Sequence, residues 1–470
     1  MKVHFVAVGG SAMHNLTMAL HLKGYEVSGS DDEIFEPARS RLARYNLLPA
    51  DEGWHHEKIT PDLDAVILGM HAREDNPELL RAKELGLKIY SYPEYLYEQS
   101  KDKKRVVIGG SHGKTTVTAM ILHVLKQEGM ECDYMVGAQL AGYDIMVRLS
   151  QTARVMVIEG DEYLTSPIDR RPKFHLYHPD IAVINGIAWD HINVFPTFEN
   201  YTEQFRIFAE SIMPDGVLAY FEGDPEVKKI GEGLSSTRPD VKRMPYRVPS
   251  YSVQDEACVL HFEGRDYPMK VFGRHNMQNI DAAWSVCRCL GIGDEAFLQA
   301  IASFEGASRR LEKIADNKTE KVSVFKDFAH SPSKLSATIA AVKEQYPERK
   351  LVACMDLHTF SSLSKAFFPH YKGCMNQADV PMVYFNPKAV EHKKLEAISE
   401  DTVFEAFDCP ALRVFSDSAA LVRELKKMDW KNANLLWMTS GNFDGVDEKA
   451  LALEIARVQG CCKYFVSSLL

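Results

Sequence analysis

The sequence lacks a long hydrophobic run, a zinc-type cysteine pair and an excess of basic charge. No apolar run reaches the ~18 residues of a membrane-spanning helix, so we expect no membrane span. The nine cysteines form no C-x-x-C pair, which favours free thiols in a reducing compartment. The formal net charge of -10 argues against the basic face of a nucleic-acid binder. Together these absences predict a cytoplasmic protein without a nucleic-acid partner.

Internal repeats and low-complexity segments are absent as well, which argues against a solenoid. Short β-branched runs instead alternate with helical patterns, which is typical of parallel sheets flanked by helices. A chain of 470 residues is too long for one ordinary core. We therefore predict an α/β protein of three domains, with a polar linker at 99–105. The predicted domain ranges are 1–103, 104–306 and 307–470.

The first block lacks the dinucleotide fingerprint G-x-G-x-x-G, which would need glycines at 9, 11 and 14. The chain has Gly9, Ser11 and His14 there. A helix that starts near Ser11 can still receive a phosphate on its first backbone N–H groups. Asp31, after the second strand, can hold ribose hydroxyls. The pattern favours a nucleotide-containing ligand over a dinucleotide, and a purely structural βαβ unit remains an alternative.

The stretch "VIGGSHGKTTVTAMI" lacks the first glycine of the usual phosphate loop, G-x-x-x-x-G-K-[ST], which would stand at position 108. Ile108 instead reads as the end of a buried strand. Apolar residues at helical spacing follow the loop: Val117, Met120, Ile121, Val124 and Leu125. A glycine loop between a strand and a helix N-terminus predicts a phosphate site, with Lys114 on the terminal phosphates and Thr115 on Mg²⁺. The alternative is an ordinary strand-to-helix turn that contains Gly-Lys.

Two further strand ends carry polar residues that a phosphate loop would use. The strand in "RVMVIEGDE" ends at Glu159, with Asp161 and Glu162 behind it. Carboxylates this close repel one another unless a cation offsets them, so a metal site or a solvated acidic loop is expected. A later strand ends in Asp190 and His191. Because Mg²⁺ prefers oxygen ligands, residue type alone favours a packed histidine at 191.

Six motifs then follow one another in a fixed order, and together they resemble the Mur ligase family. They are "GSHGKTT", "EGDE", "DH", "GRHNMQN", "SRRLE" and "DFAHSP". The family comprises the ATP-dependent ligases that build the peptide stem of the bacterial cell wall. The resemblance implies a Rossmann-like UDP-binding domain, a central P-loop ATPase domain and a Rossmann-like C-terminal domain that closes on ATP and binds the incoming amine.

The resemblance also implies the site residues and two cofactors, ATP and Mg²⁺. The implied catalytic residues are Lys114, Glu159, His191 and Arg310. The implied metal ligands are Thr115, Glu159 and His191. The implied ATP contacts are Gly110, Ser111, His112, Gly113, Lys114, Thr115, Thr116, His275, Asn276, Asn279, Arg310, Asp327 and His330. The implied UDP-sugar contacts are Gly9, Gly10, Ser11, Ala12, Met13, Ser30, Asp31 and His71.

The first block resembles the two family branches that take UDP-N-acetylmuramic acid itself. Other branches use a carbamylated lysine where this chain has Phe205. The stretches "RRPKFHLYHPDIAVINGIAWDHINVFP" and "LLWMTSGNFDGVDEKAL" resemble the branch of the murein peptide ligases more closely.

We therefore predict a ligase that joins the lactyl carboxylate of UDP-N-acetylmuramic acid to the amine of L-Ala-γ-D-Glu-meso-diaminopimelate through an acyl phosphate, in cell-wall recycling. The alternatives are L-alanine as the acceptor in de novo peptidoglycan synthesis and, in another class, a P-loop kinase or NTPase. A monomer or homodimer is expected.

Overall fold

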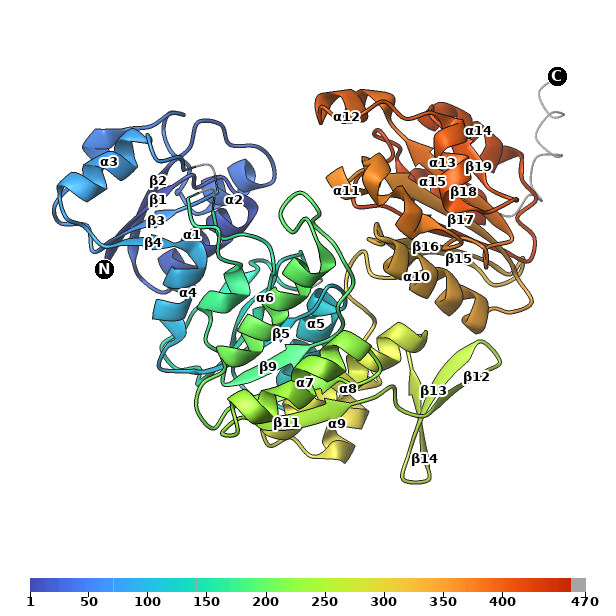
Figure 1. The fold of residues 1–470 in the computed structure, drawn as a ribbon, viewed down its shortest axis with the longest axis horizontal. Helices are drawn as coiled ribbons and strands as arrows, with labels where there is room; N and C mark the ends of the chain where they lie inside the picture. The colour runs from blue at the N-terminus through green and yellow to red at the C-terminus, as the bar shows by residue number, and fades with distance from the viewer. Residues whose placement is uncertain (71, 141, 167, 458–470) are drawn as a thin grey trace, which may run out of the picture. The chain divides into compact units, whose positions relative to one another are not determined.

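The computed structural model describes residues 1–70, 72–140, 142–166 and 168–457 (Figure 1). Within these residues the strands form four sheets, of which three are mainly parallel and flanked by helices. The predicted α/β class with three α/β domains is thus confirmed. The exact ranges of the three domains stay a prediction.

Contacts between residues divide the chain into two compact units. The first holds the N-terminal and central sheets, and the second holds the C-terminal sheet and a small antiparallel one. The first unit comprises Met1–Trp189, Val194–Arg247 and Gln278–Ile301. The second comprises Asp190–Asn193, Val248–Met277 and Ala302–Leu470, of which residues after 457 are outside the described part.

The N-terminal sheet is fully parallel, with strand order β2-β1-β3-β4. Val3, Phe5 and Val6 are almost completely buried, as expected for a parallel sheet with helices on its faces. Its elements are β1 (Lys2–Val6), α1 (Ser11–Leu22), β2 (Glu26–Ser30), α2 (Ala38–Arg44), η1 (His56–Lys58), β3 (Ala65–Leu68), α3 (Pro77–Glu84), β4 (Ile89–Ser91) and α4 (Tyr92–Ser100).

The central sheet has seven strands in the order β11-β10-β9-β5-β8-β6-β7. β5 lies between β8 and β9, so the loop that follows it is flanked by the ends of both neighbours. The elements are β5 (Lys104–Gly109), α5 (Lys114–Gln127), β6 (Asp133–Met135), β7 (Val147–Arg148), β8 (Val155–Glu159), η2 (Lys173–Leu176), β9 (Ile181–Ile184), α6 (Phe198–Glu210), β10 (Val217–Phe221), α7 (Pro225–Thr237), β11 (Lys242–Tyr246), α8 (Arg274–Cys289) and α9 (Asp294–Ile301).

The second unit combines an antiparallel sheet, β12-β13-β14, with a six-stranded sheet in the order β15-β16-β20-β17-β18-β19. All neighbours in the larger sheet are parallel except β15, an antiparallel edge strand. The elements are β12 (Tyr251–Gln254), β13 (Ala257–Phe262), β14 (Arg265–Met269), β15 (Glu312–Asn317), β16 (Val322–Asp327), α10 (Pro332–Gln345), β17 (Lys350–Leu357), α11 (Phe360–Leu363), η3 (Lys365–Tyr371), β18 (Val380–Phe385), α12 (Pro387–His392), α13 (Glu400–Phe407), β19 (Arg413–Phe415), α14 (Ser418–Lys427), β20 (Ala433–Met438) and α15 (Glu448–Ala456).

The polar linker predicted at 99–105 is wrong. α4 runs through Ser100 and β5 starts at Lys104, which leaves a short turn between them. Lys103 is buried, and its Nζ lies 2.9 Å from Asp133 Oδ2. Arg105 is buried too and donates to the carbonyls of Tyr177 and His178 at 3.0 Å each. The charges that resemble a solvated linker are instead satisfied inside the fold, as buried charges must be.

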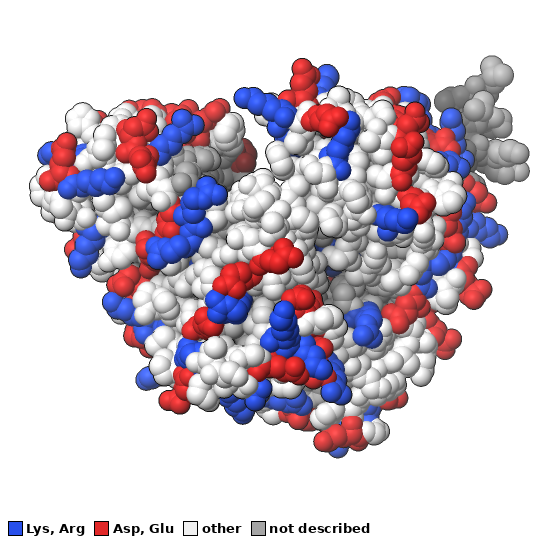
Figure 2. All heavy atoms as spheres, in the orientation of Figure 1, with Lys and Arg blue, Asp and Glu red and all other residues white. Residues whose placement is uncertain are grey.

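The surface carries both charge signs. On the face seen in Figure 2, lysine and arginine side chains are interspersed with aspartate and glutamate. In the part of the chain that the structure describes, no helix is both long and apolar enough to cross a membrane. The seven cysteines of that part are free thiols.

Candidate active site

The predicted phosphate loop lies between β5 and α5, which confirms its predicted place between a strand and a helix. Gly110 and Gly113 have φ angles of 136° and 79°, which residues with a side chain rarely adopt. A Cβ atom on Gly113 would lie 2.1 Å from Asn185 Nδ2 and 2.3 Å from Asn279 Oδ1. The loop is thus packed so closely that only glycine fits at 113, and Ile108 belongs to the strand.

The remaining loop residues are held from several sides. Ser111 Oγ lies 2.9 Å from Tyr201 Oη and accepts a hydrogen bond from Ala188 N at 2.9 Å. His112 packs against Gly186, where a Cβ atom would come within 2.7 Å of the imidazole Nε2. Thr116 is buried in the first turn of α5. These contacts fix the path of the backbone whose N–H groups would face a phosphate.

Lys114 is the first residue of α5, and two acceptors hold its ammonium group. Nζ donates to Glu162 Oε2 at 2.6 Å and to the carbonyl of Gly110 at 2.7 Å. Burial alone would lower the pKa of Lys114, but the carboxylates of Glu162 and Asp161 outweigh it and raise this pKa above its ordinary value. The lysine therefore stays charged at the mouth of the loop.

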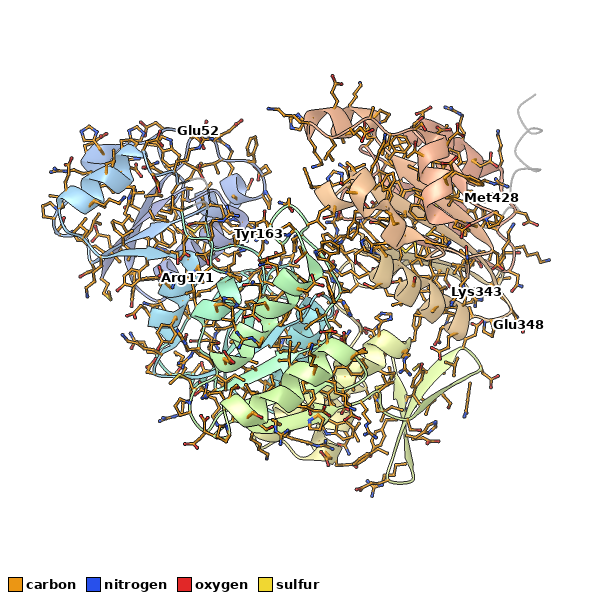
Figure 3. All side chains as sticks on the ribbon, in the orientation of Figure 1. Glu52, Tyr163, Arg171, Lys343, Glu348 and Met428 are labelled. Carbon is orange, nitrogen blue, oxygen red and sulfur yellow. The ribbon has the colours of Figure 1, made fainter. Side chains whose placement is uncertain are left out.

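The two predicted oxygen ligands for a metal lie side by side. Thr115 Oγ1 donates to Glu159 Oε1 at 2.9 Å, and Gly137 N donates to Glu159 Oε2 at 2.9 Å. Asp161 turns away and pairs with Lys173 at 2.6 Å. Tyr163, labelled in Figure 3, follows this acidic segment. Lysines thus offset Asp161 and Glu162, while Glu159 faces the threonine hydroxyl.

No group of three or more His, Cys, Asp or Glu side chains that could hold a metal occurs among the described residues. Mg²⁺ does not require such a cage, because it commonly binds one or two protein oxygens together with water and substrate phosphates. Thr115 and Glu159 match that donor set.

Asp190 and His191 belong to the second unit, as do His330 and Lys334. Asp190 Oδ2 lies 3.6 Å from His330 Nε2 and 3.7 Å from Lys334 Nζ. Burial would raise the pKa of Asp190, but His330 and Lys334 outweigh it and hold this pKa well below its usual range. His191 has a φ of 55°. Its role as a metal ligand stays a prediction.

The predicted nucleotide residues of the second unit form two groups. Asn276 and Arg310 line one cavity of about 190 Å³ together with Phe272 and Tyr346. His275 of α8 is half-buried, and its buried Nδ1 has no hydrogen-bond partner among the described residues. Asn276 and Arg310, which lie far apart in the sequence, are thus brought together.

Asp327 ends β16, and its carboxylate binds backbone groups. Oδ2 accepts from Leu311 N at 2.6 Å, and Oδ1 accepts from Ala329 N at 2.6 Å. Arg310 lies over the ring of Phe328 at 4.6 Å. In this structure Asp327 therefore fixes the turn that carries Arg310, and its contact with the ATP ribose stays a prediction.

The predicted UDP-sugar turn lies between β1 and α1. α1 begins at Ser11, with Gly10 as N-cap and without a side-chain cap or an acidic residue in its first turn. The first N–H groups of the helix, which include those of Ala12 and Met13, are not capped by a side chain of their own turn. Such a helix start suits an anion.

Asp31 supports this turn from the end of β2. Its Oδ2 accepts from Gly9 N at 2.7 Å, and both Ser30 and Asp31 are buried. The carboxylate therefore holds the backbone of the turn, and its contact with a ribose stays a prediction. His71, also predicted for this site, lies outside the described residues.

Sequence reasoning missed the residues that hold the phosphate loop from outside. Asn185 follows β9, is buried, and donates from Nδ2 to Asn279 Oδ1 at 2.7 Å. Tyr201 is buried in α6 and donates to Glu162 Oε1 at 3.0 Å. Asn185 directly follows the apolar strand pattern at 181–184, and a polar residue at the end of a strand could have indicated a site residue. No such signal marks Tyr201, because an aromatic residue on an amphipathic helix is usually a core residue.

Comparisons with known proteins agree with this geometry. Residues 2–104 match the Mur ligase family catalytic domain, and residues 108–287 match the Mur ligase middle domain. The chain is 30% identical over 450 residues to UDP-N-acetylmuramate–L-alanine ligase of Caldicellulosiruptor bescii, covering 91% of this chain and 94% of the relative.

Solved structures show the same fold. A murein peptide ligase of Psychrobacter arcticus 273-4 has a TM-score of 0.63 and 20% identity, covering 97% of this chain and 99% of that one. UDP-N-acetylmuramate–alanine ligase of Thermotoga maritima has a TM-score of 0.67 and 20% identity, covering 94% and 96%. The family models and the L-alanine ligase relative, found on this fold, define the class of the protein as an ATP-dependent ligase. The chain belongs to the Mur ligase family.

Proposed function

We propose that the chain joins L-alanine to the lactyl carboxylate of UDP-N-acetylmuramic acid, with ATP as the energy source and Mg²⁺ as the metal. The observation that carries the phosphoryl-transfer part is the cluster of Lys114, Thr115 and Glu159 at the start of α5. The choice of acceptor rests on the relatives named L-alanine ligases. They support L-alanine better than the tripeptide that the sequence stretches favoured.

The chemistry follows from the charges at the loop. A carboxylate oxygen attacks the γ-phosphorus of ATP, which gives an acyl phosphate and ADP. The amine then attacks the acyl carbon, and phosphate leaves with the amide formed. Because two anions must meet in the first step, most of the catalysis is charge neutralisation. Lys114 supplies a fixed positive charge there, and Arg310 is the proposed second one.

Mg²⁺ fits the donor set, since Thr115 and Glu159 present two oxygens 2.9 Å apart at the loop. When bound, the ion would neutralise phosphate charge. His191 is proposed as a further ligand on the family resemblance alone. The β1–α1 turn is proposed to hold the diphosphate of the UDP-sugar on its N–H groups.

The test uses ATP, UDP-N-acetylmuramic acid and one amine at a time, with phosphate release and product mass as readouts. We expect phosphate and a product heavier by one alanine residue when L-alanine is added. Phosphate release without any amine would identify an NTPase instead and contradict ligation.

Addition of a tripeptide is the second candidate. It is favoured by the two sequence stretches quoted above and is compatible with the fold shared with the Psychrobacter arcticus protein. In the same assay, turnover with L-Ala-γ-D-Glu-meso-diaminopimelate and none with L-alanine would replace the first candidate by the second.

A further inference from the structure

One buried hydroxyl group connects two of the motifs, the predicted phosphate loop and the acidic segment. Tyr201 Oη lies 2.9 Å from Ser111 Oγ of the loop and 3.0 Å from Glu162 Oε1 of the acidic segment. Ser111 Oγ in turn accepts from Ala188 N at 2.9 Å, just before Asp190 along the chain. On the other side, Glu162 Oε2 binds Lys114 Nζ at 2.6 Å.

The direction of each hydrogen bond in this series is fixed by chemistry. An ionised carboxylate can only accept hydrogen bonds, so Tyr201 must donate its single hydroxyl proton to Glu162. Ser111 must then donate to Tyr201, which leaves the serine oxygen to accept from Ala188 N–H. The series therefore runs one way, from Ala188 through Ser111 and Tyr201 to Glu162. At the end of the series, Glu162 accepts a hydrogen bond from the ammonium group of Lys114.

The ring of Tyr201 is held in place by its neighbours. Its side chain is 0% exposed. It packs edge-on against Phe205, with ring centroids 5.2 Å apart, and at a tilt against Phe195, 5.4 Å away. Thr197 caps the helix one turn earlier by accepting from Asn200 N. A locked ring on a capped helix gives the hydroxyl a defined position.

We propose that Tyr201 is a positioning residue for phosphoryl transfer, which acts by orienting Glu162 and through it the ammonium group of Lys114. This inference rests on the proposed function of the phosphate loop. An ammonium group has three donors. Gly110 O and Glu162 Oε2 accept two of them and so aim the third, which a γ-phosphate oxygen can accept.

Removing the hydroxyl with Tyr201→Phe keeps the ring but leaves Ser111 and Glu162 each short of one partner. The hydrogen bond to a charged group is the larger loss, and we expect kcat to fall about 10–100-fold. The Kd for a non-hydrolysable ATP analogue should change less than about 3-fold, because the loop N–H groups that bind phosphate remain. A merely structural role would change stability and not produce this split.

Tyr177→Phe is the matched control. Tyr177 is fully buried in the same apolar core, and its hydroxyl has no hydrogen-bond partner among the described residues. This variant should keep kcat within about 2-fold of the unaltered protein, because no hydrogen bond is lost. Circular dichroism on both variants checks the fold. If Tyr201→Phe does not fold, Glu162→Asp, which withdraws the carboxylate from Tyr201, should give the same loss of kcat.

A double-mutant cycle with Glu162→Gln tests whether Tyr201 acts through Glu162. In that background Tyr201→Phe should change kcat less than about 3-fold, since the partner that orients Lys114 is already lost. The proposal is overturned if Tyr201→Phe matches Tyr177→Phe in kcat. An undiminished loss in the Glu162→Gln background would overturn it equally.

Failure of the proposed function would look different. If L-alanine supports no turnover in the unaltered protein, the acceptor assignment fails. The cycle is then run with the amine that does support turnover. Tyr201→Phe is compared with Tyr177→Phe on that reaction, so the two hypotheses stand or fall separately.

Discussion

The turns β1–α1 and β5–α5 share one geometry and differ in the side chains around it. Each follows a buried parallel strand, contains glycine and opens a helix. In the first turn the supporting side chain is the carboxylate of Asp31, 2.7 Å from Gly9 N. In the second it is Lys114, paired with Glu162 at 2.6 Å. Backbone N–H groups can hold a phosphate, but moving one requires the added cation and metal-binding oxygens.

The largest effect is expected from removing the cation of the second turn. Lys114→Ala should lower kcat about 10²–10³-fold, as for the loss of other preorganised electrostatic groups. Lys126→Ala, in the exposed last turn of the same helix, should leave the rate unchanged. Phosphate release under saturating substrates measures both. If the Lys114→Ala rate were close to that of Lys126→Ala, the cation of the second turn would have no catalytic role, and the functional difference between the two turns would be contradicted.

The next largest effect is expected at Glu159, the proposed metal ligand. Glu159→Gln should lower kcat about 10–100-fold and raise the Mg²⁺ concentration required, since a neutral amide binds the ion more weakly. Asp161→Asn serves as control because Asp161 pairs with Lys173 instead. The measurement is a Mg²⁺ titration of phosphate release for both variants. An unchanged Mg²⁺ requirement in Glu159→Gln would contradict its role.

The glycines test the backbone half of the comparison. Gly113→Ala places a Cβ 2.1 Å from Asn185 Nδ2 at a φ of 79°, so it should destabilise the protein by about 1–3 kcal/mol and abolish tight ATP binding. Gly10→Ala has a φ of -56° and its nearest neighbour at 3.4 Å, and it should be tolerated. Urea denaturation and calorimetry with the ATP analogue check both. Equal tolerance at the two positions would mean that the loop relaxes freely.

The smallest effect concerns pH. His14 of α1 is buried, and burial lowers its pKa below 6.5. A histidine whose folded pKa is lowered contributes stability that is present above its unfolded pKa and lost as pH falls. The free energy of unfolding should therefore drop as the pH falls below about 6.5, the ordinary pKa of histidine, and His14→Gln should reduce this drop. His21→Gln, exposed on the same helix, should not.

The contribution of Lys114 to stability has the opposite dependence on pH. Its folded pKa is raised, so its contribution is full below the ordinary pKa of 10.5 and disappears only as pH rises further. Between neutral and acidic pH the second turn should thus show no titration from Lys114. A drop in stability near pH 6 that His14→Gln leaves intact would point to another group.

The local patterns predicted much of this molecule. The apolar stripe from Val117 to Leu125 is buried in α5, and Ile108 ends in the strand as expected. Glu159 lies beside Thr115 because parallel neighbouring strands deliver their ends to one edge of a sheet. The positions of adjacent elements with strong periodicity can thus be predicted from the sequence.

Other features depend on contacts that no local pattern contains. Lys103 and Arg105 resembled part of a polar linker, but carbonyl and carboxylate partners about 30 to 75 residues away hold them in the interior. Tyr201 resembled a core aromatic, and only the fold brings its hydroxyl to Ser111 and Glu162. A side chain that is both packed and hydrogen-bonded cannot be recognised before its partners are in place.

The most direct test of phosphoryl transfer to a carboxylate follows one oxygen atom. UDP-N-acetylmuramic acid labelled with ¹⁸O in its lactyl carboxylate is incubated with ATP and L-alanine, and the released phosphate is analysed by mass spectrometry. An acyl phosphate carries one carboxylate oxygen away with the phosphate, so we predict one ¹⁸O in phosphate for each amide formed. Unlabelled phosphate accompanying amide formation would contradict the account.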